Sequence, residues 1–203
     1  ENPDRQIVFV GVGFETTTPL VAMAIKRARA MGLANFTVYG AHKNMPGALE
    51  VIINDPALKL DALILPGHVS TIIGAEPYRF LAEKYGIPGV ITGFEPVDVL
   101  QGIAMIMRQL HEGRAEIEIA YARGVMPEGN PVALAAIDEV FETCSATWRG
   151  LGEIPGSGYR IREEFADFDA MRRFQPDVEE VREHKGCRCG DVLRGIMAPS
   201  ECP

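Results

Sequence analysis

Short apolar segments alternate with longer amphipathic segments along the first half of the chain. Four of the apolar segments are rich in β-branched or aromatic residues, do not alternate with polar residues and are bounded by Gly, Pro or Asn: 7–10, 36–39, 62–65 and 89–91. Uninterrupted apolar segments of this length are typical of parallel strands that are covered on both faces. We therefore predict four buried strands of a parallel sheet.

The segments between these strands have the period of α-helices. Between the first two strands, one helical face would carry Leu20, Ala24, Ile25 and Ala28. Further helices are predicted over residues 46–53, 77–85 and 97–111. Strands and helices that alternate in this way form right-handed βαβ crossovers. The predicted fold class is therefore α/β, a three-layer α/β/α sandwich with a mostly parallel sheet.

The pattern changes in the second half of the chain. Residues 117–121 are a fifth candidate strand, and 131–143 are a predicted helix with Asn130 as its N-cap. From Trp148 onward the chain is richer in Gly, Pro and charged residues. We therefore predict two domains, an α/β domain over 1–147 and a small irregular cysteine module over 148–203.

Composition narrows the class of protein. The 203 residues carry a formal charge of −8 and a pI of about 5.1, which argues against binding to nucleic acid or to an anionic membrane. Since there is no long apolar segment and no secretory signal, the cytoplasm is the expected compartment. The first residue is not Met, which suggests a processed product or a fragment.

Three polar loops follow three of the predicted strands. In an open parallel sheet, ligands bind beyond the carboxyl ends of the strands, where helix N-termini also favour an anion. Each loop brings acids, hydroxyls or a histidine to that edge, so we expect one pocket there. The candidate catalytic residues are Glu15, Thr16, Thr17, His68, Ser70, Glu95 and Asp98.

Simpler roles compete with this hypothesis. Thr16, Thr17 and Asp98 are also ordinary helix-capping residues. The Gly11-x-Gly13 pair lacks the third glycine of a dinucleotide fingerprint, so a nucleotide cofactor is not indicated. His68 could be a plain loop histidine, and this reading is stronger still for His42 and His111.

Three of the four cysteines, Cys187, Cys189 and Cys202, lie in the C-terminal segment. They could be plain surface thiols, or zinc ligands together with His184. An iron–sulfur cluster would need a fourth thiolate, either beyond Pro203 or from Cys144. Because Cys144 ends an apolar helical pattern, a buried inert thiol is its expected role.

Five motifs occur in an order that resembles the HypD family of [NiFe]-hydrogenase maturation factors. They are Gly13-Phe14-Glu15-Thr16-Thr17, Pro66-Gly67-His68-Val69-Ser70, Gly93-Phe94-Glu95-Pro96-x-Asp98, Trp148-Arg149-Gly150-Leu151-Gly152 and Cys187-x-Cys189-Gly190. The resemblance covers nearly the whole chain but only somewhat more than half of a typical member, so a fragment or truncated homologue is expected.

The resemblance implies a redox-active scaffold that helps to build the Fe(CN)2(CO) unit of the hydrogenase. It implies a HypC-type small chaperone and a HypE-type cyanide donor as partners. It also implies a [4Fe–4S] cluster, for which Cys187, Cys189 and Cys202 would be three of four ligands, and it places the loops of Glu15, His68 and Glu95 at a cleft. The part represented here would itself bind rather than catalyse.

Two other functions compete with the scaffold. One is a zinc-stabilised α/β binding module without redox function, in which the same cysteines have a structural role. The other is an α/β enzyme that acts on a small metabolite, with Glu15, His68 and Glu95 as acid–base groups.

Overall fold

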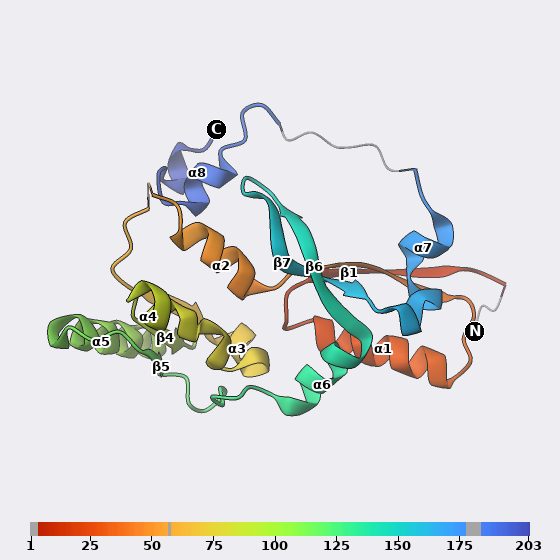
Figure 1. Ribbon diagram of the computed structural model, residues 1–203, viewed down its shortest axis with the longest axis horizontal. Coiled ribbons are helices and arrows are strands. Elements are labelled where there is room, and N and C mark those ends of the chain that lie inside the picture. The colour runs from red at the N-terminus through yellow and green to blue at the C-terminus, as the bar shows by residue number, and fades with distance from the viewer. Residues whose placement is uncertain (1–3, 57, 178–183) are drawn as a thin grey trace. The chain divides into compact units, whose positions relative to one another are not determined.

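The computed structural model describes residues 4–56, 58–177 and 184–203 (Figure 1). The chain forms two units. The first unit comprises Glu1–Leu58 together with Ala136–Pro203, and the inserted unit comprises Lys59–Ala135. The inserted unit thus interrupts the sequence of the first unit.

The first unit is built on a parallel strand pair and an antiparallel hairpin. Strands β1 (Ile7–Gly13) and β2 (Phe36–His42) pair in parallel, and α1 (Thr18–Ala30) connects them. Strands β6 (Phe141–Trp148) and β7 (Gly152–Ile161) form the hairpin, which Figure 1 shows as a long twisted ribbon. An antiparallel bridge between Lys43 and Gly158 joins the end of β2 to β7. The hairpin therefore extends the parallel pair on the β2 side.

Short helices complete the first unit. They are α2 (Met45–Ile53), η2 (Glu163–Phe168), α7 (Ala170–Phe174), α8 (Cys189–Leu193) and η3 (Pro199–Glu201). The side chain of Asn44 accepts a hydrogen bond from Gly47 N and caps α2, and Asp169 caps α7 by accepting from Met171 N and Arg172 N. The core contains Ile25, Val38, Val140, Phe141, Ile154 and Phe165.

The inserted unit is a three-stranded parallel sheet with helices. Strands β3 (Leu63–Pro66), β4 (Gly89–Thr92) and β5 (Ile117–Ile119) lie in the order β3-β4-β5. The helices are α3 (Gly67–Ile73), η1 (Glu76–Tyr78), α4 (Arg79–Tyr85) and α5 (Pro96–Glu112). All four residues of the central strand β4 are buried, as expected for a covered parallel strand. Helix α6 (Pro131–Val140) leads back to the first unit, and Asn130 Oδ1 caps it as predicted, accepting from Ala133 N.

The predicted α/β class with mostly parallel strands is confirmed, and five predicted strands are present. They belong, however, to two separate parallel sheets, β1-β2 and β3-β4-β5. The helix predicted over 131–143 is wrong in its last turn, because α6 ends at Val140 and Phe141 begins β6. Both residues are buried, and an apolar pair of this kind suits a helix and a strand equally.

The prediction that every strand is covered on both faces is wrong for β1. Val10 and Val12 are 60% and 66% exposed, and Ile7, Val8 and Phe9 are exposed as well. Strand β1 pairs with β2 on one side, and among the described residues no strand pairs with its other edge. An edge strand of this kind presents unpaired backbone groups beside apolar side chains.

The bounds of the two structural units differ from the domain boundary after residue 147 that the sequence predicts. Strands β6 and β7 pair with each other across that boundary. The division of function between an α/β domain and a cysteine module over 148–203 stays a prediction, and residues 178–183 of that module lie outside the described residues. In the part of the chain that is described, no helix is long and apolar enough to span a membrane.

Candidate functional site

The first candidate loop follows β1 and turns sharply at Gly13. Its φ of 150° is disfavoured for residues with a side chain, and a Cβ there would lie 2.3 Å from Thr17 Oγ1. The hydroxyls of Thr17 and Thr18 both donate to the carbonyl of Phe14, at 3.1 and 2.9 Å. Thr17 is therefore engaged at the start of α1, and Thr16 lies half-buried beside it.

Glu15 is buried in this loop, with 1% of its surface exposed. Its Oε1 accepts a hydrogen bond of 2.8 Å from Met45 N, at the start of α2. Its Oε2 has no hydrogen-bond partner among the described residues. Burial raises the pKa of Glu15, and backbone hydrogen bonds offset part of that effect. One oxygen of the carboxylate is thus fixed by a hydrogen bond, whereas the other has none among the described residues.

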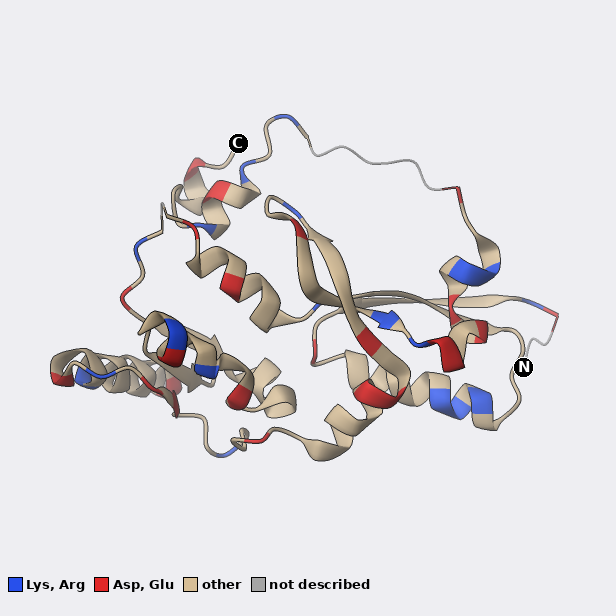
Figure 2. Cartoon of the chain, in the orientation of Figure 1, with Lys and Arg blue, Asp and Glu red and all other residues tan. Residues whose placement is uncertain are grey.

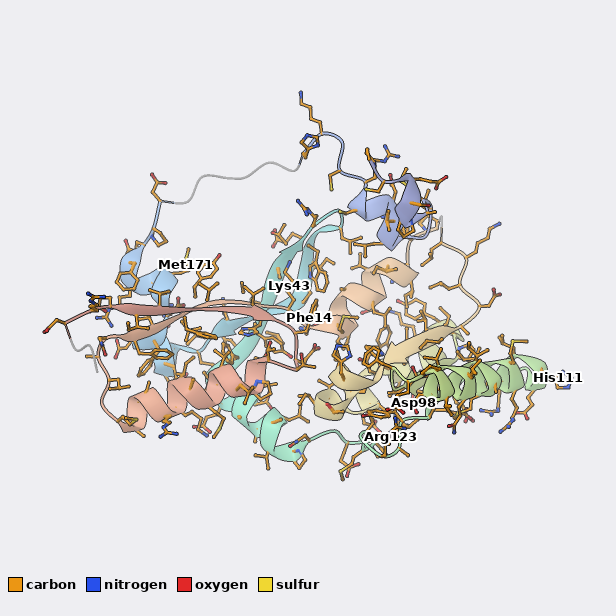
Figure 3. The ribbon with its side chains drawn as sticks, turned by 180° about the vertical axis from the view of Figure 1, so that it is seen from behind. Phe14, Lys43, Asp98, His111, Arg123 and Met171 are labelled. Carbon is orange, nitrogen blue, oxygen red and sulfur yellow. The ribbon has the colours of Figure 1, made fainter. Side chains whose placement is uncertain are left out.

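The Phe14 side chain links this loop to the hairpin. Its ring lies 5.9 Å from the Trp148 ring, and the Lys43 ammonium lies 5.0 Å from the centre of the same indole. Trp148 Nε1 donates to Ser157 Oγ at 2.8 Å, which fixes the indole on the hairpin. Figure 3 shows Phe14 and Lys43 near each other. The first motif and the Trp148 motif therefore meet within the first unit.

The inserted unit brings four predicted site residues to the carboxyl ends of β3 and β4. His68 and Ser70 lie in α3, which starts directly after β3, and Glu95 is the N-cap residue of α5. Asp98 lies in the first turn of α5 and is buried. Ser70 Oγ donates to the Pro66 carbonyl at 2.9 Å, so this hydroxyl is engaged within its own helix.

Arg123 joins the two acids of this edge, and Figure 3 shows it beside one of them, Asp98. It donates to both oxygens of Asp98, at 2.7 and 2.6 Å, and to Glu95 Oε2 at 3.2 Å. Its guanidinium also lies 4.6 Å from the centre of the Tyr121 ring. The hydrogen bond from Arg123 holds the pKa of Asp98 below its ordinary value. The sequence analysis missed Arg123, because it lies outside every motif.

An exposed ring pair lies at the same edge of the inserted unit. His68 and Phe94 have ring centroids 5.0 Å apart, and Phe94 is 71% exposed. His68 is exposed too, which leaves its imidazole accessible to a ligand. The edge therefore combines an accessible imidazole, an exposed aromatic ring and an ion pair.

The structure distributes the seven predicted residues over both units. Glu15, Thr16 and Thr17 belong to the first unit, whereas His68, Ser70, Glu95 and Asp98 belong to the inserted unit. The first group lies at the turn after β1, and the second group lies at the turns after β3 and β4. A single pocket that contains Glu15, His68 and Glu95 stays a prediction.

The three C-terminal cysteines form a group of interacting thiols. Hydrogen bonding to the neighbouring Cys187 thiol raises the pKa of Cys189, and burial raises it further. Cys202 raises the same pKa through its charge, whereas Arg149 lowers it. All three cysteines are half-buried and free of disulfides. Within the described ranges, no three Cys, His, Asp or Glu side chains are arranged to hold one metal ion.

The remaining cysteine lies apart from that group in sequence and structure. Cys144 is half-buried in the middle of β6, rather than at the end of a helix, and burial raises the pKa of its thiol. It lines a cavity of about 200 Å³ together with residues of β2 and β7. A raised thiol pKa agrees with the inert role that the sequence suggested.

His42 lies in a strand and not in a loop, where the sequence analysis placed it. It lies in β2 and is buried, and neither ring nitrogen has a hydrogen-bond partner among the described residues. Its ring packs 6.0 Å from the ring of Phe141, and burial lowers its pKa. We therefore assign His42 to the core as a neutral side chain. His111, also treated as a loop residue, lies in the last turn of α5.

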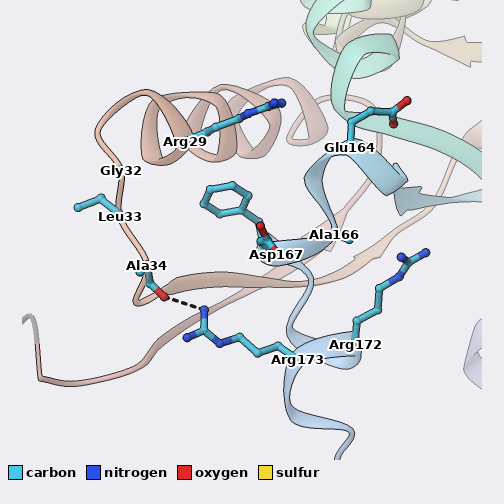
Figure 4. A pocket seen from close by; sticks show the side chains of 10 residues that line it. Arg29, Gly32, Leu33, Ala34, Glu164, Ala166, Asp167, Arg172 and Arg173 are labelled. Atoms are coloured by element: carbon cyan, nitrogen blue, oxygen red, sulfur yellow. Dashed lines mark hydrogen bonds between the residues drawn. The ribbon is translucent and has the colours of Figure 1, made fainter.

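A larger cavity of about 680 Å³ lies between α1 and the η2–α7 region (Figure 4). Arg173 Nη1 donates to the Ala34 carbonyl at its rim, and the Arg29 guanidinium lies 4.8 Å from the centre of the Phe165 ring. Figure 2 shows the basic residues that gather at the end of α1 on this side. None of the predicted site residues lines this cavity, so it is separate from both candidate edges.

Comparison with known proteins gives consistent results over the whole chain. The family model described as "HypD: Hydrogenase formation hypA family" matches residues 1–203. The hydrogenase maturation factor HypD of Rhodobacter capsulatus is 49% identical over 206 residues, which cover 99% of this chain and 55% of the relative. The proteins of the same name from Azotobacter vinelandii and Cupriavidus necator are 47% and 44% identical, and each is also covered to 55%. The chain thus spans about half the length of the curated relatives it matches.

Proposed function

This chain belongs to the HypD family of hydrogenase formation proteins, and from this premise we propose that it acts in hydrogenase maturation as an assembly scaffold. The scaffold would carry a thiolate-bound redox centre on the first unit. The presence of three free, half-buried thiols in the C-terminal segment, those of Cys187, Cys189 and Cys202, is the observation that carries this proposal. The cytoplasm is the compartment that we propose for this work.

The donor set suits an iron–sulfur cluster. Thiolates are the usual ligands of such clusters, and Cys187 and Cys189 are separated by a single residue at the start of α8. We propose that these two thiols and Cys202 are three of the four ligands of a [4Fe–4S] cluster. When bound, the cluster would supply or accept single electrons. The protein would hold the cluster, orient its ligands and limit the access of water.

The cargo of the scaffold would be the Fe(CN)2(CO) unit of the [NiFe] hydrogenase. A cyanide ligand accepts hydrogen bonds at its nitrogen, and the exposed imidazole of His68 can donate one. Arg123 would keep the neighbouring Asp98 ionised and Glu95 in position. As partners we propose a HypC-type small chaperone and a HypE-type protein, which delivers cyanide.

Metal analysis of protein purified without oxygen tests the redox centre. We expect iron and sulfide in near-equal amounts, with a broad visible absorption that is lost in Cys187→Ser and Cys189→Ser. The matched control is Cys144→Ser, which changes a thiol outside the group and should retain the iron. Full iron retention in both of the first two variants would contradict the proposed ligands.

The same analysis separates the competing functions. Zinc without sulfide would favour the zinc-stabilised binding module, in which His184 would be the fourth ligand. His184 lies next to the thiols in sequence, and its Nδ1 accepts a hydrogen bond from Gly186 N at 3.1 Å. The metabolite enzyme would be favoured only if a small molecule bound saturably and its turnover did not change in Cys187→Ser.

A further inference from the structure

We propose that the turn of the β6–β7 hairpin is a platform that holds the cysteine segment, residues 187–202, in place before any metal binds. Gly150, Gly190 and Arg194 are the positioning residues of this platform. The purpose of the platform rests on the proposed metal-binding function, whereas its contacts lie between protein atoms alone. The platform belongs entirely to the first unit.

The turn and the cysteine segment touch through their backbones. A Cβ on Gly150 would lie 2.3 Å from Gly190 N, and a Cβ on Gly190 would lie 2.4 Å from the Gly150 carbonyl oxygen. Distances this short leave no room for a side chain at either position. Gly150 also has a φ of 76°, which favours glycine at the turn. Because Gly190 directly follows Cys189, the contact fixes the chain beside a thiol.

Arg194, the C-cap residue of α8, holds the same segment at a second position. Its Nη2 donates to the Gly150 carbonyl at 3.2 Å, and its Nε lies 3.4 Å from Asp55 Oδ2. Asp55 directly follows the C-cap residue of α2, so Arg194 ties the cysteine segment to both the turn and that helix. Within the segment, Arg194 N donates to the Gly190 carbonyl at 3.1 Å. The two anchoring positions are therefore one turn of α8 apart.

The contacts of Trp148 fix the turn to other parts of the first unit. Trp148 starts the turn, is hydrogen-bonded to Ser157 and packs against Phe14 of the first candidate loop. A rigid support of this kind lowers the entropy that the thiols lose when they bind a metal. The geometry thus indicates that the first, fourth and cysteine motifs are connected by direct contacts.

Gly190→Ala isolates the backbone contact. Gly190 lies in α8 at a negative φ, so alanine suits its conformation and even favours the helix. The added methyl group would nevertheless meet the Gly150 carbonyl. The matched control is Gly186→Ala, which is equally close to a cysteine, but whose nearest neighbour is the movable side chain of His184 at 3.3 Å.

Hydrogen–deuterium exchange of the metal-free protein measures the effect. We expect amides 189–196 to exchange about tenfold faster in Gly190→Ala than in the wild type, as for a contact worth about 1.4 kcal/mol, and to be unchanged in Gly186→Ala. Amides of β6 report whether the first unit stays folded. If Gly190→Ala unfolds it, Arg194→Met is the deciding variant, because this side chain is partly exposed.

The outcomes separate the platform from the proposed cluster. Equal exchange in Gly190→Ala and Gly186→Ala, or in Arg194→Met and the wild type, would overturn the platform. Faster exchange together with weaker iron retention against a chelator would support both proposals. Faster exchange in these variants, together with a wild-type chain that retains neither iron nor sulfide, would retain the platform and refute the cluster.

Discussion

The buried carboxylate of Glu15 predicts a stabilising substitution. At neutral pH this group is 1% exposed, has one hydrogen bond from Met45 N and leaves Oε2 without a described partner. In Glu15→Gln the amide oxygen can still accept from Met45 N, while the buried charge is removed. A buried acceptor without a partner costs about 1–3 kcal/mol, and more when it is charged. We therefore expect Glu15→Gln to raise the free energy of unfolding by about 1–2 kcal/mol at pH 7.

The raised pKa of Glu15 determines how the effect of Glu15→Gln on stability depends on pH. Burial raises the pKa of Glu15 in the folded chain, so the folded form binds a proton at a pH at which the unfolded chain has lost it. The stability of the wild type therefore falls as the pH rises from the ordinary glutamate value of about 4.3 to the raised pKa, and this loss persists above it. Hence the advantage of Glu15→Gln should grow as the pH rises above the ordinary glutamate value and should shrink toward pH 4.

Urea unfolding followed by tryptophan fluorescence is a suitable assay. Trp148 is the one tryptophan of the chain and belongs to the same unit as Glu15. The control is Glu153→Gln, which removes an exposed carboxylate from β7 and should change stability by less than about 0.5 kcal/mol. A Glu15→Gln protein that is less stable than the wild type at pH 7 would refute the reasoning, since it would mean that the charge has a favourable partner.

Three further substitutions test other parts of the fold. Asp98→Asn should lower the melting temperature of the inserted unit above about pH 4 and have little effect well below it, because the Arg123 hydrogen bond depresses the pKa of Asp98; calorimetry at several pH values would show this. Tyr159→Phe should remove one late-ionising tyrosine from the alkaline absorbance titration, since burial raises the pKa of Tyr159. Phe141→Ala should cost about 3–5 kcal/mol in urea unfolding, because this ring is 1% exposed in the core; a cost below about 1 kcal/mol would contradict its placement.

Local patterns were sufficient to predict most elements of this fold. The central strand β4 is a short apolar segment, rich in β-branched residues and bounded by Pro and Gly, and it is buried along its whole length. The grouping of the strands into two sheets was not predictable, because it depends on which strand edges meet. In the same way, nothing in the local pattern around Val140 distinguishes the last turn of a helix from the start of a hairpin.

The candidate site residues, too, were predictable only where local sequence and topology determine their position. Loops after parallel strands meet at one edge, so the clustering of His68, Glu95 and Asp98 in the inserted unit followed from topology. Arg123 was missed because it reaches Asp98 across 25 positions of the sequence. The contact of Gly150 with Gly190 was equally hidden, since glycine in a turn has many causes and its partner lies 40 positions away.

The insertion of one unit into the other has a consequence for synthesis on the ribosome. Strands β1 and β2 are translated early, but the β6–β7 hairpin that completes their core follows only after Lys59–Ala135. At about 5–20 residues per second, this interval lasts roughly 4–15 s. The inserted unit can fold in that time, because its strands are contiguous in sequence. During this interval the exposed apolar side chains of β1 could associate with other chains. A chaperone would therefore be of most use at this stage of synthesis.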